Sequence, residues 1–287
     1  MESTLKQGRY FFAIAILALG VENLVNGFFH IYDSRGFPGE IVTAVIPWVS
    51  TSPWLAYFTG LLLIVGALAM ISNARPRLAA AMLGILFLIF VIALEARRLA
   101  NLGGRTIFFE PLAIAGSALT LAGLLPDESR GVSPDSQRWL RSLDWLIRLG
   151  PFFFAASCID FGIDHLVFLR YVATLVPSFI PWHLFWTYFT AFAFIAAALS
   201  IATRWMGSWA GTMLGVMFLL WFVLLHLPRA FGVSPASGPG APKNPNEWSS
   251  AFIALAMAGG SWVMGLHCLK NPYRLFQGRT LPAVAAD

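Results

Sequence analysis

The chain has few charged residues and few cysteines, and both shortages limit the classes of protein to which it can belong. Only 11% of its 287 residues are charged, whereas soluble domains carry about 25%. The hydrophobic share is 58%, which predicts a membrane protein with several spans. The two cysteines, Cys158 and Cys268, are far apart and form no CxxC pair. That spacing excludes a disulfide framework and a thioredoxin-type redox motif, so we interpret both as packing residues.

Familiar catalytic and nucleotide-binding motifs are missing from the sequence as well. It has no glycine-rich phosphate loop, no GxSxG nucleophile turn, no haem-attachment motif and no HExxH zinc motif. The net charge of +5 comes from Lys and Arg residues scattered over short loops, not from one basic patch. We therefore expect no nucleic-acid partner, and we expect the lipid bilayer as the environment.

Apolar runs of about 20 residues, the length needed to cross a bilayer, recur through the chain. None alternates strictly as a barrel strand does, so we expect helices, which satisfy their own backbone in lipid. The first run resembles a signal peptide, but a similar run lies in mid-chain, so we expect a retained helix. The eight expected spans are residues 10–29, 54–71, 78–96, 108–125, 151–168, 182–201, 209–227 and 249–268.

The sequence also repeats itself. GRYFFAIAILALGVENLV from Gly8 matches GPFFFAASCIDFGIDHLV from Gly150, and AMLGILFLIFVIALEARR from Ala81 matches TMLGVMFLLWFVLLHLPR from Thr212. A repeat of this length predicts a duplicated bundle, and four spans per copy make the copies parallel. We therefore expect an all-α integral membrane protein whose eight transmembrane helices form two parallel four-helix-bundle repeats.

The repeat also predicts how the chain is divided. We expect a first unit over residues 1–125, a polar and amphipathic linker over 126–149, a second unit over 150–270 and a tail over 271–287. The linker's WLRSLDWLIRL stretch is typical of a helix lying in the membrane interface. Most of the 19 Lys and Arg residues fall in loops on the side of the N-terminus. This bias predicts both termini in the cytoplasm of a bacterial-type inner membrane.

Charged side chains inside the spans are costly and need a reason. Two histidines that we expect inside the membrane, His165 and His226, belong to the second repeat, where they accompany several carboxylates. The main candidates for a catalytic or binding site are Asp164, His165, His226, Arg229 and Glu247. Weaker candidates for cofactor binding are Asp160, His183 and Trp186. Their expected counterparts in the first repeat are Glu22, Asn23, Glu95, Arg98 and Glu110, with Glu110 matched to Glu247.

Four interpretations of these polar residues stay open. They could lock helices together, as polar groups do in membranes. They could move protons while a quinone headgroup changes its redox state, because histidine titrates near neutral pH. They could form the proton relay of a transporter. A metal site would use Asp164, His165, His226 and Glu247 as ligands, although their spacing is not that of a known metal motif.

Several short motifs resemble the DoxX-like family of membrane proteins. They are GVEN at Gly20–Asn23, GIDH at Gly162–His165, YFTG at Tyr57–Gly60 and YFTA at Tyr188–Ala191, together with the Met-Leu-Gly helices. The resemblance implies one four-helix bundle per unit. It also implies a link to membrane redox chemistry, because the family includes a subunit of thiosulfate:quinone oxidoreductase. We therefore expect a quinone-linked redox subunit or accessory with a membrane redox partner, the alternatives being a carrier of a small molecule or lipid and a scaffold.

Overall fold

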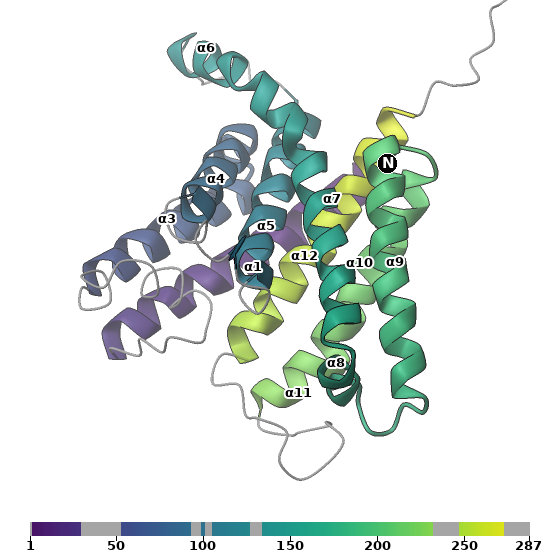
Figure 1. Cartoon of the computed structure of the whole chain (residues 1–287). Coiled ribbons are helices and arrows are strands. Elements are labelled where there is room, and N and C mark those ends of the chain that lie inside the picture. The colour runs from purple at the N-terminus through teal and green to yellow at the C-terminus, as the bar shows by residue number, and fades with distance from the viewer. Residues whose placement is uncertain are drawn as a thin grey trace, which may run out of the picture.

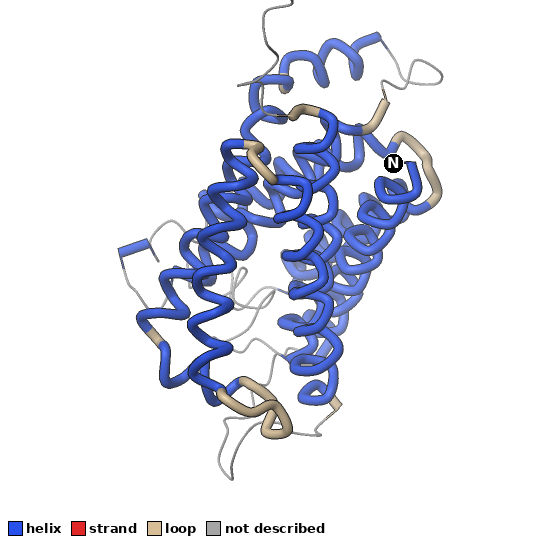
Figure 2. Tube along the Cα trace, turned by 90° about the vertical axis from the view of Figure 1, so that its right-hand side faces the viewer, coloured by secondary structure: helices blue, strands red, loops and turns tan. Residues whose placement is uncertain are grey.

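The structure is a computed structural model that describes residues 2–29, 53–92, 99–100, 105–126, 134–231 and 247–272. Every regular element in these ranges is a helix, which confirms the predicted all-α class. The long helices run alongside one another, and α6 lies across one end of the bundle (Figure 1, Figure 2). The elements are α1 Glu2–Phe29, α3 Pro53–Ile71, α4 Pro76–Phe90, α5 Arg105–Leu124, α6 Pro134–Ser142, α7 Asp144–Val167, α8 Leu169–Leu175, α9 His183–Thr203, α10 Gly207–Trp221, the π-helix η4 Phe222–His226, α11 Leu227–Ala230 and α12 Glu247–Lys270.

Seven helices in the described part of the chain are long and apolar enough to cross a membrane. The expected eighth span coincides with α4, which has 15 residues and continues into a π-helical turn at residues 91–92. The remainder of that expected span lies outside the described residues. Asp144 starts α7 within the stretch that we assigned to the linker, so the amphipathic sequence there is divided between α6 and the first turns of α7.

The core of the bundle is built on α5 and α12. Of the residues in the most apolar stretch of each, 72% are buried, compared with 33% in α3 and α9. Small side chains allow this close approach: a Cβ on Gly260 of α12 would lie 2.8 Å from Cβ of Ser117 on α5. The outer helices expose large apolar side chains such as Phe185 and Phe192 of α9. These exposed rings suit contact with lipid.

The helices pack in the same order in both halves of the chain. α1 packs along α3 and α12, while α7 packs along α9 and α5. In the same way α4 packs along α5, α10 packs along α12, and the two central helices contact each other. The first helix of each half therefore packs along the last helix of the other half, and this exchange joins the two expected four-helix units into one body.

Matched glycines hold the first two helices of each half close together. A Cβ on Gly20 of α1 would lie 2.9 Å from the carbonyl oxygen of Gly60 on α3. Its match, Gly162 of α7, would place a Cβ 2.8 Å from the carbonyl oxygen of Ala191 on α9. Both distances are too short for a real Cβ, so the GVEN and GIDH motifs require glycine for helix packing.

The turns between the second and third helices of each half share an unusual backbone. Asn73 and Arg75 have φ angles of 59° and 56°, and Arg204 and Met206, at the matching positions, have φ angles of 65° and 53°. Positive φ is uncommon outside glycine. The same pair of left-handed residues therefore turns the chain before α4 and before α10.

Candidate functional site

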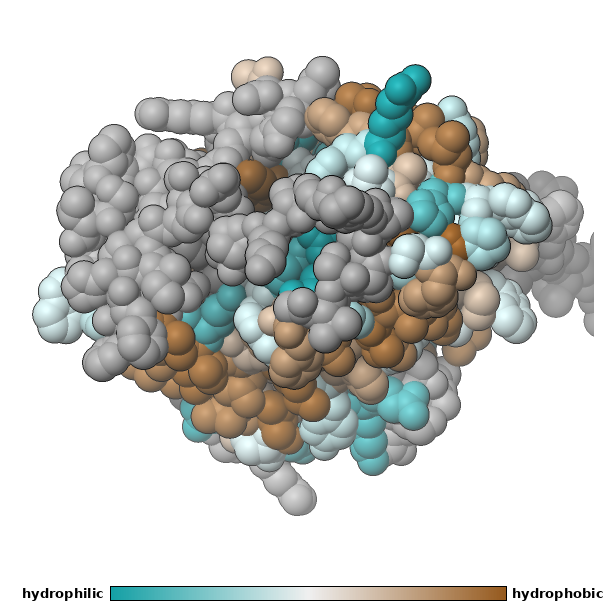
Figure 3. Space-filling view, turned by 90° about the horizontal axis from the view of Figure 1, so that it is seen from below, coloured by the Kyte–Doolittle hydropathy of each residue, from teal (hydrophilic) through white to brown (hydrophobic). Residues whose placement is uncertain are grey.

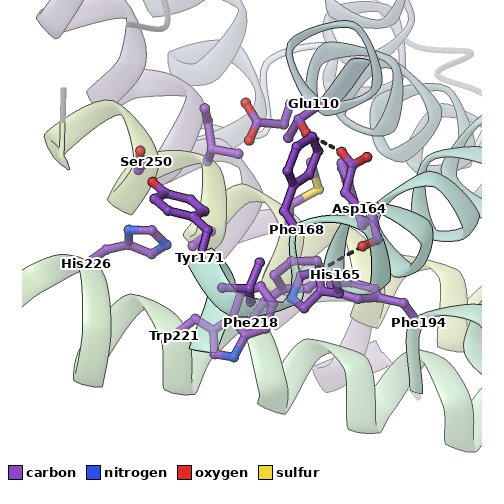
Figure 4. A pocket seen from close by; sticks show the side chains of 16 residues that line it. Glu110, Asp164, His165, Phe168, Tyr171, Phe194, Phe218, Trp221, His226 and Ser250 are labelled. Carbon is purple, nitrogen blue, oxygen red and sulfur yellow. Dashed lines mark hydrogen bonds between the residues drawn. The ribbon is translucent and has the colours of Figure 1, made fainter. Parts of the chain in front are cut away.

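A cavity of about 380 Å³ lies between α5 of the first half of the chain and α7, α8, α9, α10, η4 and α12 of the second half (Figure 4). It is near the end of the bundle at which α8 and α11 lie (Figure 1). Seen from that end, hydrophilic side chains gather in the middle of the face, with hydrophobic ones beside them (Figure 3). Its aromatic walls are Phe161, Phe168, Tyr171, Phe194, Phe218 and Trp221. Its polar residues are Thr106, Glu110, Asp164, His165, His226 and Ser250.

Asp164 is the most enclosed charged residue of the cavity. It lies in the last turn of α7 and is only 7% exposed. The hydroxyl of Thr106, near the start of α5, donates a hydrogen bond to its Oδ2. Its Oδ1 is buried and accepts no hydrogen bond from any residue in the described ranges. A carboxylate that is half satisfied in this way presents one acceptor atom to whatever occupies the cavity.

His165 follows Asp164 and has a fixed orientation. Its Nδ1 lies 2.7 Å from the carbonyl oxygen of Phe161, one turn earlier in α7. Its ring stacks on Trp221 with centroids 5.6 Å apart and planes at 15°, and it meets the ring of Phe194 edge-on at 5.4 Å. A carbonyl oxygen only accepts hydrogen bonds, so Nδ1 carries the proton and Nε2 of the neutral ring is an acceptor.

His226 reaches the cavity from the other side, at the end of η4. A π-helical turn is rare and occurs most often at functional sites. The Nδ1 of His226 lies 3.3 Å from Oε2 of Glu247, the first residue of α12. Oε1 of Glu247 lies 2.7 Å from the guanidinium of Arg229, and both of these side chains are more than nine-tenths buried. The ion pair of α11 and α12 thus holds the imidazole in place.

A second buried ion pair lies beside the cavity. The guanidinium of Arg105, the first residue of α5, donates to Oδ1 of Asp160 on α7. The Asp160 side chain is 2% exposed, and that of Arg105 is 24% exposed. Arg105 also lies over the ring of Phe109, 6.0 Å from its centroid. The pair fastens the start of α5 to α7, one helical turn from Asp164.

The first half carries a matching contact between a hydroxyl and a carboxylate. Ser249 of α12 donates to Oε1 of Glu22 on α1 at 2.6 Å, as Thr106 of α5 donates to Asp164 of α7. Asn23, which follows Glu22, donates its amide to the hydroxyl of Thr59 at 3.0 Å. The first turn of each central helix is therefore held by a carboxylate from the helix that packs along it.

These contacts correct the register that we expected between the last helices of the two halves. The prediction matched Glu110 with Glu247. The hydroxyl contacts match Thr106 with Ser249, and the same register sets Glu110 opposite Ile253. The expected match depended on the similarity of Phe109-Glu110 to Asn246-Glu247. Gly116, which contacts α7, and Gly259, which contacts α1, instead set the register several residues further along.

The structure brings some predicted site residues together and separates others. Asp164, His165, His226 and Glu110 line the cavity, while Glu247 and Arg229 contact it through His226. His183 and Trp186 lie on α9 and do not line it, and Asp160 pairs with Arg105 instead. Glu22 and Asn23 lie in the other half, and Glu95 and Arg98 lie outside the described residues. Sequence reasoning missed Arg105, Thr106, Tyr171, Trp221 and Ser250.

Within the described ranges, no three His, Cys, Asp or Glu side chains are grouped closely enough to hold a metal ion. The chain was also compared with known proteins. No protein-family model, no curated protein and no solved structure matches it. The DoxX-like resemblance therefore stays a prediction that depends on the sequence motifs alone.

Proposed function

We propose that this polytopic membrane protein binds the headgroup of a quinone-type ligand in the cavity of its second half, as a redox subunit or accessory of DoxX-like type. The observation that carries the proposal is the cavity itself: aromatic walls around two oriented imidazoles and one carboxylate, of which one oxygen has no partner among the described residues. Small-molecule sites are mostly apolar, with a few polar groups that fix orientation. A flat ring with two oxygen atoms suits this combination.

The size and place of the cavity support the same ligand class. Its volume of about 380 Å³ is within the range of small-ligand sites, roughly 300–1,000 Å³. Its walls belong to helices with the length and apolar composition of membrane spans. A quinone partitions into lipid, and from there its tail can remain among apolar side chains while its headgroup enters the cavity.

We infer that the architecture behind this site is two parallel four-helix units, with α4 as the eighth span and both termini on the cytoplasmic side. The matched helix packing, the matched glycines and the matched left-handed turns support the duplication. The distribution of Lys and Arg supports the orientation. In this arrangement the cavity lies in the outer half of the membrane.

The test is to identify what the protein carries. The full chain would be purified gently from its native membrane, and its small molecules would be extracted and identified by mass spectrometry. We expect a near-stoichiometric quinone in the wild type and a reduced amount in His226→Ala. The matched control is His267→Ala, the same change near the far end of α12 and away from the cavity.

The identity of the bound molecule distinguishes the quinone proposal from the carrier and structural alternatives. A quinone that is retained by His267→Ala and lost by His226→Ala supports the proposal. A stoichiometric lipid or another small molecule in place of the quinone would favour the carrier alternative. Preparations free of any bound molecule, together with no quinone binding on addition, would overturn the proposal and favour a structural role for the polar residues.

A further inference from the structure

The polar atoms that the cavity offers to a ligand are mainly hydrogen-bond acceptors. Asp164 supplies the clearest one. Its Oδ2 already receives the hydroxyl of Thr106, whereas its buried Oδ1 has no partner among the residues that the structure describes. An ionised carboxylate can only accept hydrogen bonds. A buried acceptor left unpaired is costly, so an occupant that donates to Oδ1 gains more than one that does not.

The two histidines add acceptors of the same kind. Nδ1 of His165 is fixed as a donor by the carbonyl oxygen of Phe161, at 2.7 Å. Nδ1 of His226 is fixed as a donor by the carboxylate of Glu247, at 3.3 Å, and the other oxygen of that carboxylate lies 2.7 Å from the guanidinium of Arg229. A neutral imidazole has one donor and one acceptor nitrogen. Each ring therefore has only its Nε2, an acceptor, available for a ligand.

Arginine side chains do not change this excess of hydrogen-bond acceptors over donors in the cavity. Arg105 and Arg229 do not line the cavity, and they are engaged with Asp160 and Glu247. The remaining polar side chains of the wall are the carboxylate of Glu110 and the hydroxyls of Thr106, Tyr171 and Ser250. A hydroxyl both donates and accepts, and the proton of Thr106 is already donated to Asp164. The cavity thus has few atoms that could donate to the carbonyl oxygen of a bound quinone.

We propose that the cavity binds the reduced form of its ligand, the hydroquinone, in preference to the quinone, with one ring hydroxyl donating to Oδ1 of Asp164. This inference rests on the proposed function and names its preferred redox form. The two carbonyl oxygens of a quinone can only accept, and one of them would face the lone pairs of Asp164. Each hydroxyl of a hydroquinone carries a proton that an acceptor in the cavity can receive.

The preference for hydroquinone over quinone can be measured as the ratio of their dissociation constants. A hydrogen bond to a charged group contributes enough to change an affinity by about tenfold or more. We expect the dissociation constant of the hydroquinone to be at least about tenfold lower than that of the quinone. By linkage, binding then raises the midpoint potential of the bound two-electron couple by about 30 mV for each factor of ten.

The experiment uses the full chain in lipid nanodiscs under anaerobic conditions. The probes are a decyl-substituted benzoquinone, its hydroquinone and the dimethyl ether of that hydroquinone, each measured by equilibrium binding. The dimethyl ether keeps the ring and tail but cannot donate, so we expect it to bind no better than the quinone. In Asp164→Asn an amide N–H replaces the acceptor, and we expect the preference for hydroquinone to vanish or reverse.

The matched control is Asp144→Asn, the same substitution at the far end of the same helix, where the side chain is 46% exposed. We expect this variant to keep the wild-type preference. Equal binding of the three probes, or tighter binding of the quinone, would overturn this inference while leaving the proposed function standing. No binding of any probe to the wild type would overturn both. If Asp164→Asn does not fold, the comparison of hydroquinone with its dimethyl ether on the wild type still tests whether a donated proton strengthens binding.

Discussion

Removing Arg105 should destabilise the protein strongly, because it leaves a buried carboxylate without its partner. The Asp160 side chain is 2% exposed, and the guanidinium of Arg105 is its only hydrogen-bond donor among the described residues. Breaking a buried ion pair from one side costs about 3–5 kcal/mol. Since Arg105 is itself 24% exposed, water can reach part of the site, and we expect Arg105→Met to lower the free energy of unfolding by about 3 kcal/mol.

A double variant tests the physical reason for this loss. At the matching contact of α1 with α12, Ala18 and Trp248 occupy the corresponding positions, so an apolar pair is compatible with this packing. We therefore expect Asp160→Ala combined with Arg105→Met to recover most of the lost stability. The assay is denaturant unfolding of the full chain in mixed micelles, followed by tryptophan fluorescence. Arg138→Met, in an exposed pair, is the control and should change little. A stable Arg105→Met, or a double variant no better than the single one, would refute the reasoning.

Three further predictions concern packing, exposure and topology. We expect Gly116→Ala to cost roughly 1–3 kcal/mol, because its Cβ would lie 2.6 Å from a backbone carbonyl oxygen of α7. In Gly123→Ala the new Cβ meets only the Cγ2 methyl of Ile147, at 2.9 Å, and no backbone atom, so it should cost less in the same unfolding assay. Cys158 and Cys268 are buried, so a membrane-impermeant maleimide should label neither in the folded protein. A cysteine at the exposed Asp135 should label from the cytoplasmic side alone, and labelling from the opposite side would reverse the proposed topology.

The local structure followed from the sequence because it depends on neighbouring residues. Long apolar runs require helices in lipid, and these helices formed near the expected positions. The end of α8 also follows from the local sequence. This short helix ends at Leu175, and Pro177 and Pro181, which disfavour a continuing helix, follow it. Four of the site candidates line the cavity, because charged residues inside apolar helices are rare enough to be noticed.

The contacts between helices could not be predicted from the same patterns. Periodicity indicates which face of a helix is apolar, but it does not tell which helix covers that face or in which register. The expected span began at residue 108, whereas α5 begins at Arg105, which contacts Asp160. Thr106 and Ser250 carry no charge, so nothing in the sequence separated them from the other hydroxyl residues of the spans.

The differences between the halves decide which interpretation of the polar residues is stronger. A helix lock accounts for the carboxylate contacts of both halves, because each fastens a first helix to a central one. A helix lock does not account for the other differences between the two halves. In the first half Asn23 is engaged with Thr59, and Leu63 stands where the second half has Phe194. In the second half an imidazole, His165, packs between aromatic rings at the wall of a cavity. Locking two helices requires neither the imidazole nor the cavity, whereas an aromatic-walled cavity with an oriented polar group is the usual form of a small-molecule site.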